Sequence, residues 1–262
     1  MKSHQNDNAA PLKPQGSSTP EWYATWFESP WYMRLYRHRT DVEAVEATEI
    51  VTKHARIPNG AHVLDLCCGY GRHALALAQI GYNVVGIDQS RFLIDRAREV
   101  YPHANVRYEV ADMRGPFSGA PYDAIINFFT SFGYFDSHDE NMKVLHAVHD
   151  ALVDGGVFIM DFFNSRVVRR ELVAETVSMI DDVTLIQERA IVEPFVAKTI
   201  TVSDPCSYET VFHERVWLYE HAELVKMFAE ARLVVEQTLG DYNGATFDAE
   251  QSPRTILIAR RT

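Results

Sequence analysis

Short strand-like runs alternate with amphipathic segments along much of the chain. The runs are 63–66, 83–87, 106–110, 122–126 and 157–161. The segments between them, such as 91–100 and 139–152, place apolar residues at helical spacing. Apolar runs of this length are typical of strands that are buried on both faces of a parallel sheet. The alternation therefore predicts an α/β domain around a mostly parallel sheet.

The alternation stops between about residues 164 and 219. Segments rich in β-branched residues, separated by turn signals, follow one another there: 177–180, 183–190, 191–202 and 210–218. We expect three or four antiparallel strands, inserted after the fifth strand of the core. A helix over 220–231 and a closing pair of strands, 233–238 and 255–259, would then complete the main sheet.

The first 58 residues carry two different patterns. Residues 1–20 are polar, contain several prolines and lack the apolar centre of a signal peptide, so we expect a disordered tail. Residues 22–36 are dense in aromatics with interleaved arginines, and 41–56 has the pattern of a capped helix. The aromatic segment is either a helix packed on the domain surface or part of a lid.

Composition narrows the class of protein. The net charge of −11 disfavours a nucleic-acid partner, because an acidic chain is repelled by phosphate backbones. The three cysteines, Cys67, Cys68 and Cys206, have no metal-ligand spacing and offer no ordinary disulfide between neighbours. No apolar run approaches the roughly 20 residues of a membrane span. These features predict a cytoplasmic protein without a membrane partner.

A glycine turn follows the first strand. Gly69 and Gly71 separate that strand from the helical run 74–78, which is the start of a βαβ unit. Glycines let a ligand approach the backbone, and the helix that follows offers free N–H groups. Asp88 ends the next strand, where it could accept hydrogen bonds from ribose hydroxyls. Nicotinamide-dependent oxidoreductases use the same arrangement, so this turn alone leaves that alternative open.

The run VLDLCCGYGR from Val63, followed by GIDQS from Gly86, resembles the first two motifs of class I S-adenosylmethionine (SAM) methyltransferases. The sequence departs from that family at Cys67, where a glycine is usual. The resemblance implies a doubly wound, mostly parallel seven-stranded sheet with an antiparallel last strand. It also implies SAM as cofactor and transfer of a methyl group to nitrogen or oxygen of a small molecule.

The resemblance also implies a set of cofactor residues. They are Tyr36, Arg39, Asp65, Cys67, Cys68, Gly69, Gly71, Asp88, Gln89, Asp112, Met113, Asn127 and Phe128. Tyr36 and Arg39 would hold the methionine carboxylate, because an arginine fork suits a carboxylate. Asp112 would accept from the adenine amino group and Met113 would cover the ring. A cap or turn role is the alternative for Asp112.

The resemblance implies fewer residues for the pocket of the methyl acceptor. The resemblance places Tyr32, Thr130, Phe132 and Tyr242 in the acceptor pocket, with Tyr134 and Asp161 as possible bases beside His138 and Asp241. The insertion is either a cover for this pocket or a dimerisation surface, so the chain is expected to be a monomer or a homodimer.

The expected division of the chain is a tail (1–20), lid helices (21–58), a SAM-binding core (59–164), an antiparallel insertion (165–219) and the rest of the core (220–262). Besides the oxidoreductase, a SAM-binding protein without methyltransferase activity remains an alternative, because its binding motifs would look the same.

Overall fold

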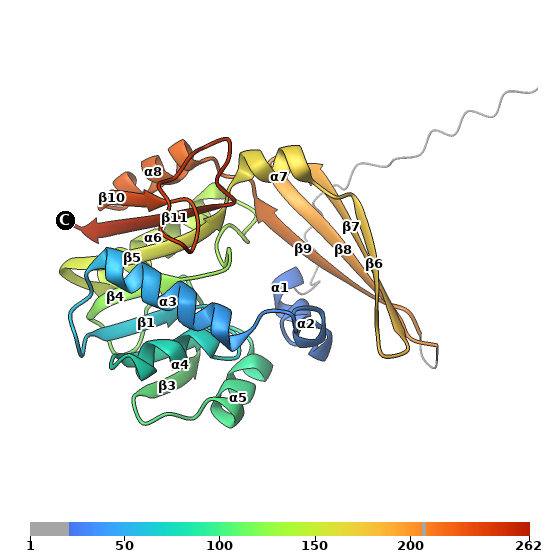
Figure 1. The fold of residues 1–262 in the computed structure, drawn as a ribbon, viewed down its shortest axis with the longest axis horizontal. Coiled ribbons are helices and arrows are strands. Elements are labelled where there is room, and N and C mark those ends of the chain that lie inside the picture. Colours follow the sequence, from blue (N-terminus) through green and yellow to red (C-terminus); the bar gives the residue numbers. More distant parts are fainter. Residues whose placement is uncertain (1–20, 206–207) are drawn as a thin grey trace, which may run out of the picture.

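A seven-stranded sheet forms the centre of the computed structural model, which describes residues 21–205 and 208–262, so the predicted tail lies outside it. Its strands are β1 (His62–Leu66), β2 (Asn83–Asp88), β3 (Val106–Val110), β4 (Tyr122–Asn127), β5 (Leu152–Phe163), β10 (Leu233–Leu239) and β11 (Arg254–Arg261). Their order is β10-β11-β5-β4-β1-β2-β3, and β11 runs antiparallel to both neighbours. The predicted fold class is confirmed (Figure 1).

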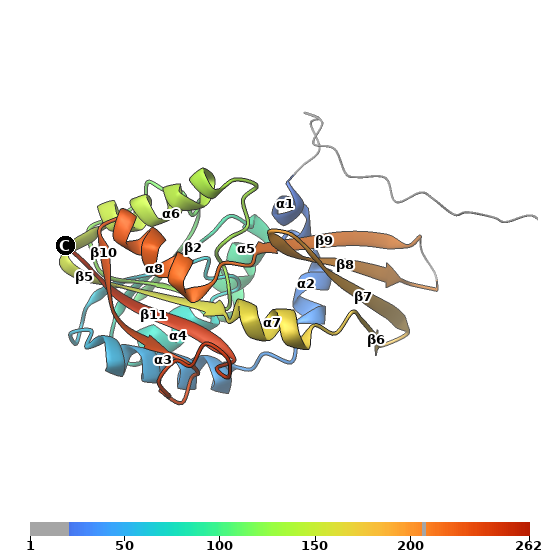
Figure 2. The same cartoon turned by 90° about the horizontal axis from the view of Figure 1, so that it is seen from above.

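Helices cover both faces of this sheet (Figure 2). On one face lie α3 (Asp41–Ala55), α4 (Arg72–Gln79) and α5 (Arg91–Val100), and on the other lie α6 (His138–Ala151) and α8 (His221–Glu230). The predicted inward face of α6 is fully buried at Val144, Leu145 and Val148. Burial of such a stripe stabilises a helix far more than its intrinsic propensity does.

Two local features differ from the sequence-based expectation. Strand β5 begins at Leu152, before the predicted run 157–161, because a register shift opposite Tyr122 and Ala124 accommodates the extra residues as a bulge. Gly155, with φ of 73°, supplies the left-handed conformation there. A short helix, α7 (Ser165–Glu171), was not predicted, and the side chain of Asn164 caps its first turn.

The insertion forms a separate four-stranded antiparallel sheet with strands in sequence order. The strands are β6 (Glu175–Ile180), β7 (Val183–Val192), β8 (Phe195–Ser203) and β9 (Thr210–Trp217). The turn between β7 and β8 lies at Glu193 and Pro194, so the strand expected over 191–202 was wrong at its start. Proline cannot donate to the ladder, which favours the turn at this point.

The aromatic N-terminal segment packs against the inserted sheet. It forms α1 (Trp22–Trp26) and α2 (Pro30–Leu35), which lie between the two sheets (Figures 1 and 2). Trp26 and Leu35 form a small second core with Leu185 and Ile200. The segment thus packs against the insertion, and its function as part of a lid stays a prediction; α1 and α2 are called the lid below. Among residues 21–205 and 208–262, no helix is long and apolar enough to cross a membrane.

Candidate functional site

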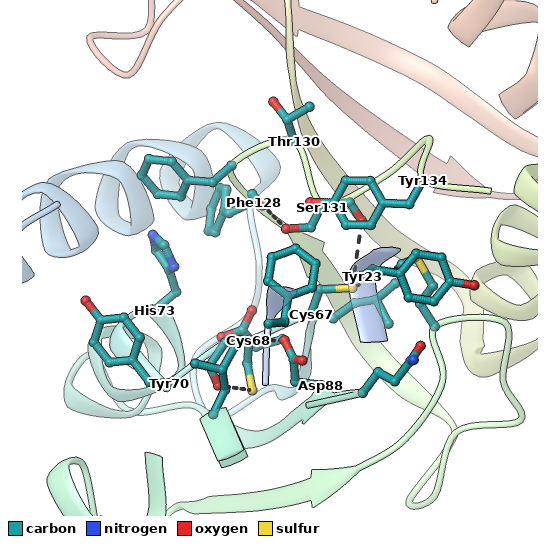
Figure 3. Close-up of a pocket in the computed structure, with 18 of the residues that line it drawn as sticks. Tyr23, Cys67, Cys68, Tyr70, His73, Asp88, Phe128, Thr130, Ser131 and Tyr134 are labelled. Atoms are coloured by element: carbon teal, nitrogen blue, oxygen red, sulfur yellow. Dashed lines mark hydrogen bonds between the residues drawn. The ribbon is translucent and has the colours of Figure 1, made fainter. Parts of the chain in front are cut away.

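A cavity of about 310 Å³ opens at the carboxyl ends of the parallel strands (Figure 3). Small-molecule sites usually measure about 300–1,000 Å³. Its walls come from three parts of the chain: the core, mainly the loops after β1, β2, β3 and β4, then the segment with α1 and α2, and strand β9. Open α/β sheets bind ligands at this edge.

The glycine loop lies at the base of the cavity. Gly69 and Gly71 have φ of 56° and 95°, so both need the left-handed conformation. A Cβ at Gly71 would come within 2.6 Å of the Tyr108 hydroxyl, which also excludes a side chain. Cys67 is left-handed too, with φ of 64°. This is a strained conformation for a residue other than glycine, at the position where the related family has glycine.

Asp88 connects the glycine loop to the end of β2. One carboxylate oxygen accepts the Gly69 N–H and the other accepts the Ser90 N–H, both at 2.9 Å. Burial raises the pKa of Asp88 to about 6, and these hydrogen bonds oppose the shift. Each oxygen keeps further acceptor capacity, and the side chain lines the cavity. Asp88 can therefore accept hydrogen bonds from a ligand.

Asp65 is a second acid beneath the loop. It is 1 % exposed and lines the cavity, and its Oδ2 has no hydrogen-bond partner. Burial first, and then the nearby Asp88 charge, raise the pKa of Asp65 to about 7. An unpaired buried acceptor is costly, so this oxygen is suited to a donor on a ligand.

Basic side chains gather around the Phe129 ring in the wall of the cavity. Arg39 stacks over the rings of Tyr36 and Phe129 at 4.2 and 4.9 Å, and Arg72 lies 5.7 Å from the Phe129 ring. Neither arginine forms an ion pair with any residue that the structure describes. Burial lowers the pKa of His73 to about 3, so His73 is neutral, and its Nε2 has no partner. These groups can receive an anionic part of a ligand.

Arg72 and His73 were not among the site residues predicted from the sequence. The available signal was their place at the start of the helix after the glycine turn, where free N–H groups already favour an anion.

Glu214 of β9 joins the lid to the inserted sheet. Its carboxylate accepts from the Trp26 indole at 2.5 Å and the Tyr36 hydroxyl at 2.8 Å, and pairs with Lys198 of β8 at 3.1 Å. Tyr36 also accepts a hydrogen bond from Lys198 at 2.8 Å. The Tyr36 hydroxyl is thus engaged by protein groups, so its expected role as a carboxylate ligand stays a prediction. Glu214 lies far from the lid in sequence, so no local pattern pointed to it.

An aromatic wall closes the acceptor side. Trp22 contacts Tyr134 with ring centroids 5.1 Å apart, and Phe27 lies 5.9 Å from Tyr134 and 5.0 Å from Tyr32. The Trp22 indole N–H is buried without a partner. Burial raises the pKa of Tyr134 well above its usual value, so its phenol stays protonated and is a poor base. Such a wall attracts cations through the faces of its rings.

Asp161 is not available as a base. It is fully buried, it pairs with Arg254 through both oxygens at 2.7 Å, and it accepts the Phe129 N–H at 2.7 Å. Tyr242 donates its hydroxyl to the same carboxylate and does not line the cavity, which corrects its expected place in the acceptor pocket.

Three further residues differ from their expected roles. Phe132 is 1 % exposed and packs in the core beside Phe162 and Tyr219, away from the cavity. The carboxylate of Asp112 is bound by the Arg114 guanidinium through two nitrogens, so the turn alternative holds there. Asn127 is buried, and its amide donates to the Leu66 and Ser131 carbonyls, tying β4 to β1.

The structure brings the remaining predicted residues together. The following line the cavity: Tyr32, Tyr36, Arg39, Asp65, Cys67, Cys68, Gly69, Gly71, Asp88, Gln89, Met113, Phe128, Thr130 and Tyr134. Asp112, Asn127, Phe132, Asp161 and Tyr242 are outside the lining. Within the part of the chain that the structure describes, no three His, Cys, Asp or Glu side chains gather as a metal site.

Comparison with known proteins agrees with this geometry. Residues 63–156 match the family described as methyltransferase domain. The chain is 27% identical over half its length to a dTDP-3-amino-3,4,6-trideoxy-alpha-D-glucopyranose N,N-dimethyltransferase of Streptomyces venezuelae, covering 54% of that protein. It is 33% identical to a trans-aconitate 2-methyltransferase of Paracidovorax citrulli, over 52% of this chain and 51% of that one. The chain thus spans about half the length of these two relatives.

A sugar N-methyltransferase from a Streptoalloteichus species has the same fold, with a TM-score of 0.69, 17% identity and 99% of each chain covered. Residues 63–156 therefore belong to a methyltransferase domain, and the chain has the fold of SAM-dependent methyltransferases.

Proposed function

We propose that this protein transfers a methyl group from SAM to a nitrogen of a small-molecule acceptor. The observation that carries the proposal is a single cavity in which Asp88 and the glycine loop face an aromatic wall built by the lid. The first part suits an adenosyl group, and the second suits a positively charged centre.

The residues of the cavity fit the parts of SAM one by one. Asp88 would accept the ribose hydroxyls, and Met113 would lie against the adenine. The unpaired Oδ2 of Asp65 would accept from the ammonium group, while Arg39 and Arg72 would hold the carboxylate. Bound SAM would supply a methyl group on a sulfonium, which is already a good leaving group. The protein then needs mainly to align the acceptor.

Nitrogen is favoured over oxygen because none of the four expected bases is available. Asp161 is fully engaged, and the Tyr134 phenol has a raised pKa. His138 and Asp241 do not line the cavity. A neutral amine brings its own lone pair, whereas a hydroxyl needs a base to remove its proton. The amino-sugar relative supports the same choice.

The inserted sheet supports a small acceptor. Glu214 and Val216 of β9 line the cavity, which supports a role for the insertion as a cap over the acceptor end. Dimerisation through the insertion stays an alternative prediction. We place the protein in the cytoplasm, because the two free thiols of Cys67 and Cys68 suit a reducing compartment.

Calorimetric titration with SAM, S-adenosylhomocysteine (SAH) and NAD tests the cofactor. We expect both adenosyl ligands to bind and NAD not to bind. NAD binding alone would contradict the proposal in favour of an oxidoreductase. Mass spectrometry of paired acceptors, an amine and its hydroxyl analogue on one scaffold, then tests the atom methylated. Binding of SAM without SAH production from any acceptor would favour a protein that only binds SAM.

A further inference from the structure

Two residues at the end of β4 have an unusual backbone conformation. Phe129 and Thr130 have φ of 55° and 61°, so two successive residues other than glycine are left-handed. For a β-branched residue such as Thr130 this is a costly conformation. Strain of this kind persists only where surrounding contacts compensate for it.

Those contacts come from a buried ion pair. Asp161 accepts the Phe129 N–H at 2.7 Å with its carboxylate and the Thr130 N–H at 3.0 Å with its main-chain oxygen. Arg254 binds both oxygens of Asp161 and also donates to the Thr130 hydroxyl at 2.9 Å. The same hydroxyl accepts the Phe163 N–H at 3.1 Å. The two N–H groups of the turn and the Thr130 hydroxyl are therefore all bound by β5 and β11.

The turn lies between the two sides of the cavity, and Thr130 is seen above it in Figure 3. Towards the cofactor side, the Phe129 ring lies 4.9 Å from Arg39 and 5.1 Å from the His73 ring. Towards the acceptor side, Thr130 is followed by Ser131 and Tyr134, which also line the cavity. A change in the conformation of this turn would therefore move the cofactor side of the cavity relative to its acceptor side.

We propose that Asp161 and Arg254 are positioning residues for methyl transfer, which hold the Phe129–Thr130 turn in its left-handed form and so align the acceptor with the cofactor. This inference rests on the proposed function. Asp161 is fully buried and does not line the cavity, so it acts through the turn and contacts no ligand itself. Arg254 does line the cavity, but its Nε and Nη2 are bound to Asp161 and Thr130, so these atoms also act on the turn. In-line transfer is sensitive to such alignment, since a displacement of about 1 Å can cost about 100-fold in rate.

A matched pair of substitutions at Thr130 tests this role. Thr130→Val keeps the branched shape but removes the hydroxyl that Arg254 and Phe163 bind, whereas Thr130→Ser keeps the hydroxyl. We expect Thr130→Val to lower kcat about 10- to 100-fold with the SAH dissociation constant within about threefold of the wild type. Thr130→Ser should keep most of the wild-type kcat. Thr184→Val, in β7 and outside the cavity lining, is the control for a threonine-to-valine change.

Asp161→Asn gives an independent test, because it removes the charge that holds Arg254 while keeping the size of the side chain. Crystal structures of Thr130→Val and Asp161→Asn should show φ of Thr130 outside the left-handed region. An unchanged turn in both, or an unchanged kcat in folded variants whose turn has moved, would overturn the proposal.

The two proposals fail in different ways. A wild-type protein that binds SAH but methylates no acceptor would contradict the proposed function. The crystal structures would then still decide whether the ion pair holds the turn.

Discussion

At the scale of single residues, Asp88 is expected to accept charge-assisted hydrogen bonds from the cofactor. Its carboxylate ties the glycine loop to β2 through Gly69 and Ser90 and keeps acceptor capacity towards the cavity. We predict that Asp88→Ala weakens SAM binding by about 1.5–3 kcal/mol, or roughly 10- to 100-fold, the usual loss for a charge-assisted hydrogen bond. Calorimetry measures the change, with the exposed Asp95→Ala as control. Unchanged affinity in a folded Asp88 variant would remove this residue from the site.

The neighbouring acids Asp65 and Asp88 also predict that the stability of the protein depends on pH. Burial raises the pKa of Asp65 to about 7, so the folded protein holds this proton more tightly than the unfolded chain, whose pKa is near 3.8. The contribution of protonated Asp65 to the free energy of unfolding is fully present below about pH 4, and it is lost as the pH rises through about 7.

We therefore predict that Asp65→Asn loses less thermal stability than the wild type between pH 5 and pH 8. Thermal unfolding at both values measures this, and each 1 kcal/mol corresponds to about 2–4 °C in a domain of this size. Asp95→Asn, whose side chain is exposed, is the control. A parallel loss in the wild type and in Asp65→Asn would contradict the raised pKa.

At the scale of elements, the lid is attached to both parts of the molecule. Glu28 accepts the Arg91 N–H at 2.7 Å, and Ser90 donates to the Phe27 carbonyl at 2.8 Å, which fixes α1 and α2 to the start of α5. Glu214 binds the other side of the lid to β9 through Trp26 and Tyr36. The lid thus bridges the core and the insertion.

We predict that Glu214→Gln loosens the lid, because it leaves the Lys198 charge unpaired at 12 % side-chain exposure. The expected loss in the free energy of unfolding is roughly 2–3 kcal/mol, somewhat below the 3–5 kcal/mol for a fully buried pair. The rate of proteolysis within residues 21–40 and titration with SAM measure how far the lid is loosened. The double variant Glu214→Gln with Lys198→Met should recover part of the stability. If the double variant is no more stable than the single one, the ion pair does not hold the lid.

At the scale of the whole molecule, the cavity joins three regions that are far apart in sequence. The loops of the core, the lid and β9 all line it, so a bound ligand should stabilise them together. We predict that SAH at 100 times its dissociation constant raises the free energy of unfolding by about 2.7 kcal/mol. Hydrogen exchange should slow in α1, α2 and β9 as well as in the glycine loop. Protection confined to residues 63–113 would show that the lid and the insertion take no part in binding.

The sequence alone determined the main sheet and the cofactor end of the cavity. Its strands are short apolar runs and its turn rests on Gly69 and Gly71, which are local features that burial and backbone sterics impose wherever the chain folds. Asp88 was predicted as a site residue for the same reason, because it ends the strand beside that turn. The four inserted strands were also visible as β-branched runs, although Pro194 placed one turn later than expected.

Only the tertiary structure decided which polar groups are free. Asp112 and Asp161 look like site residues from their positions at strand ends, but Arg114 and Arg254 occupy their carboxylates. Glu214 looks like an ordinary residue of an edge strand, yet it holds the lid and lines the cavity. Pairing of charges depends on contacts between segments distant in the chain. Local pattern therefore predicts where the cavity lies, while packing determines which side chains face it with unused hydrogen-bonding capacity.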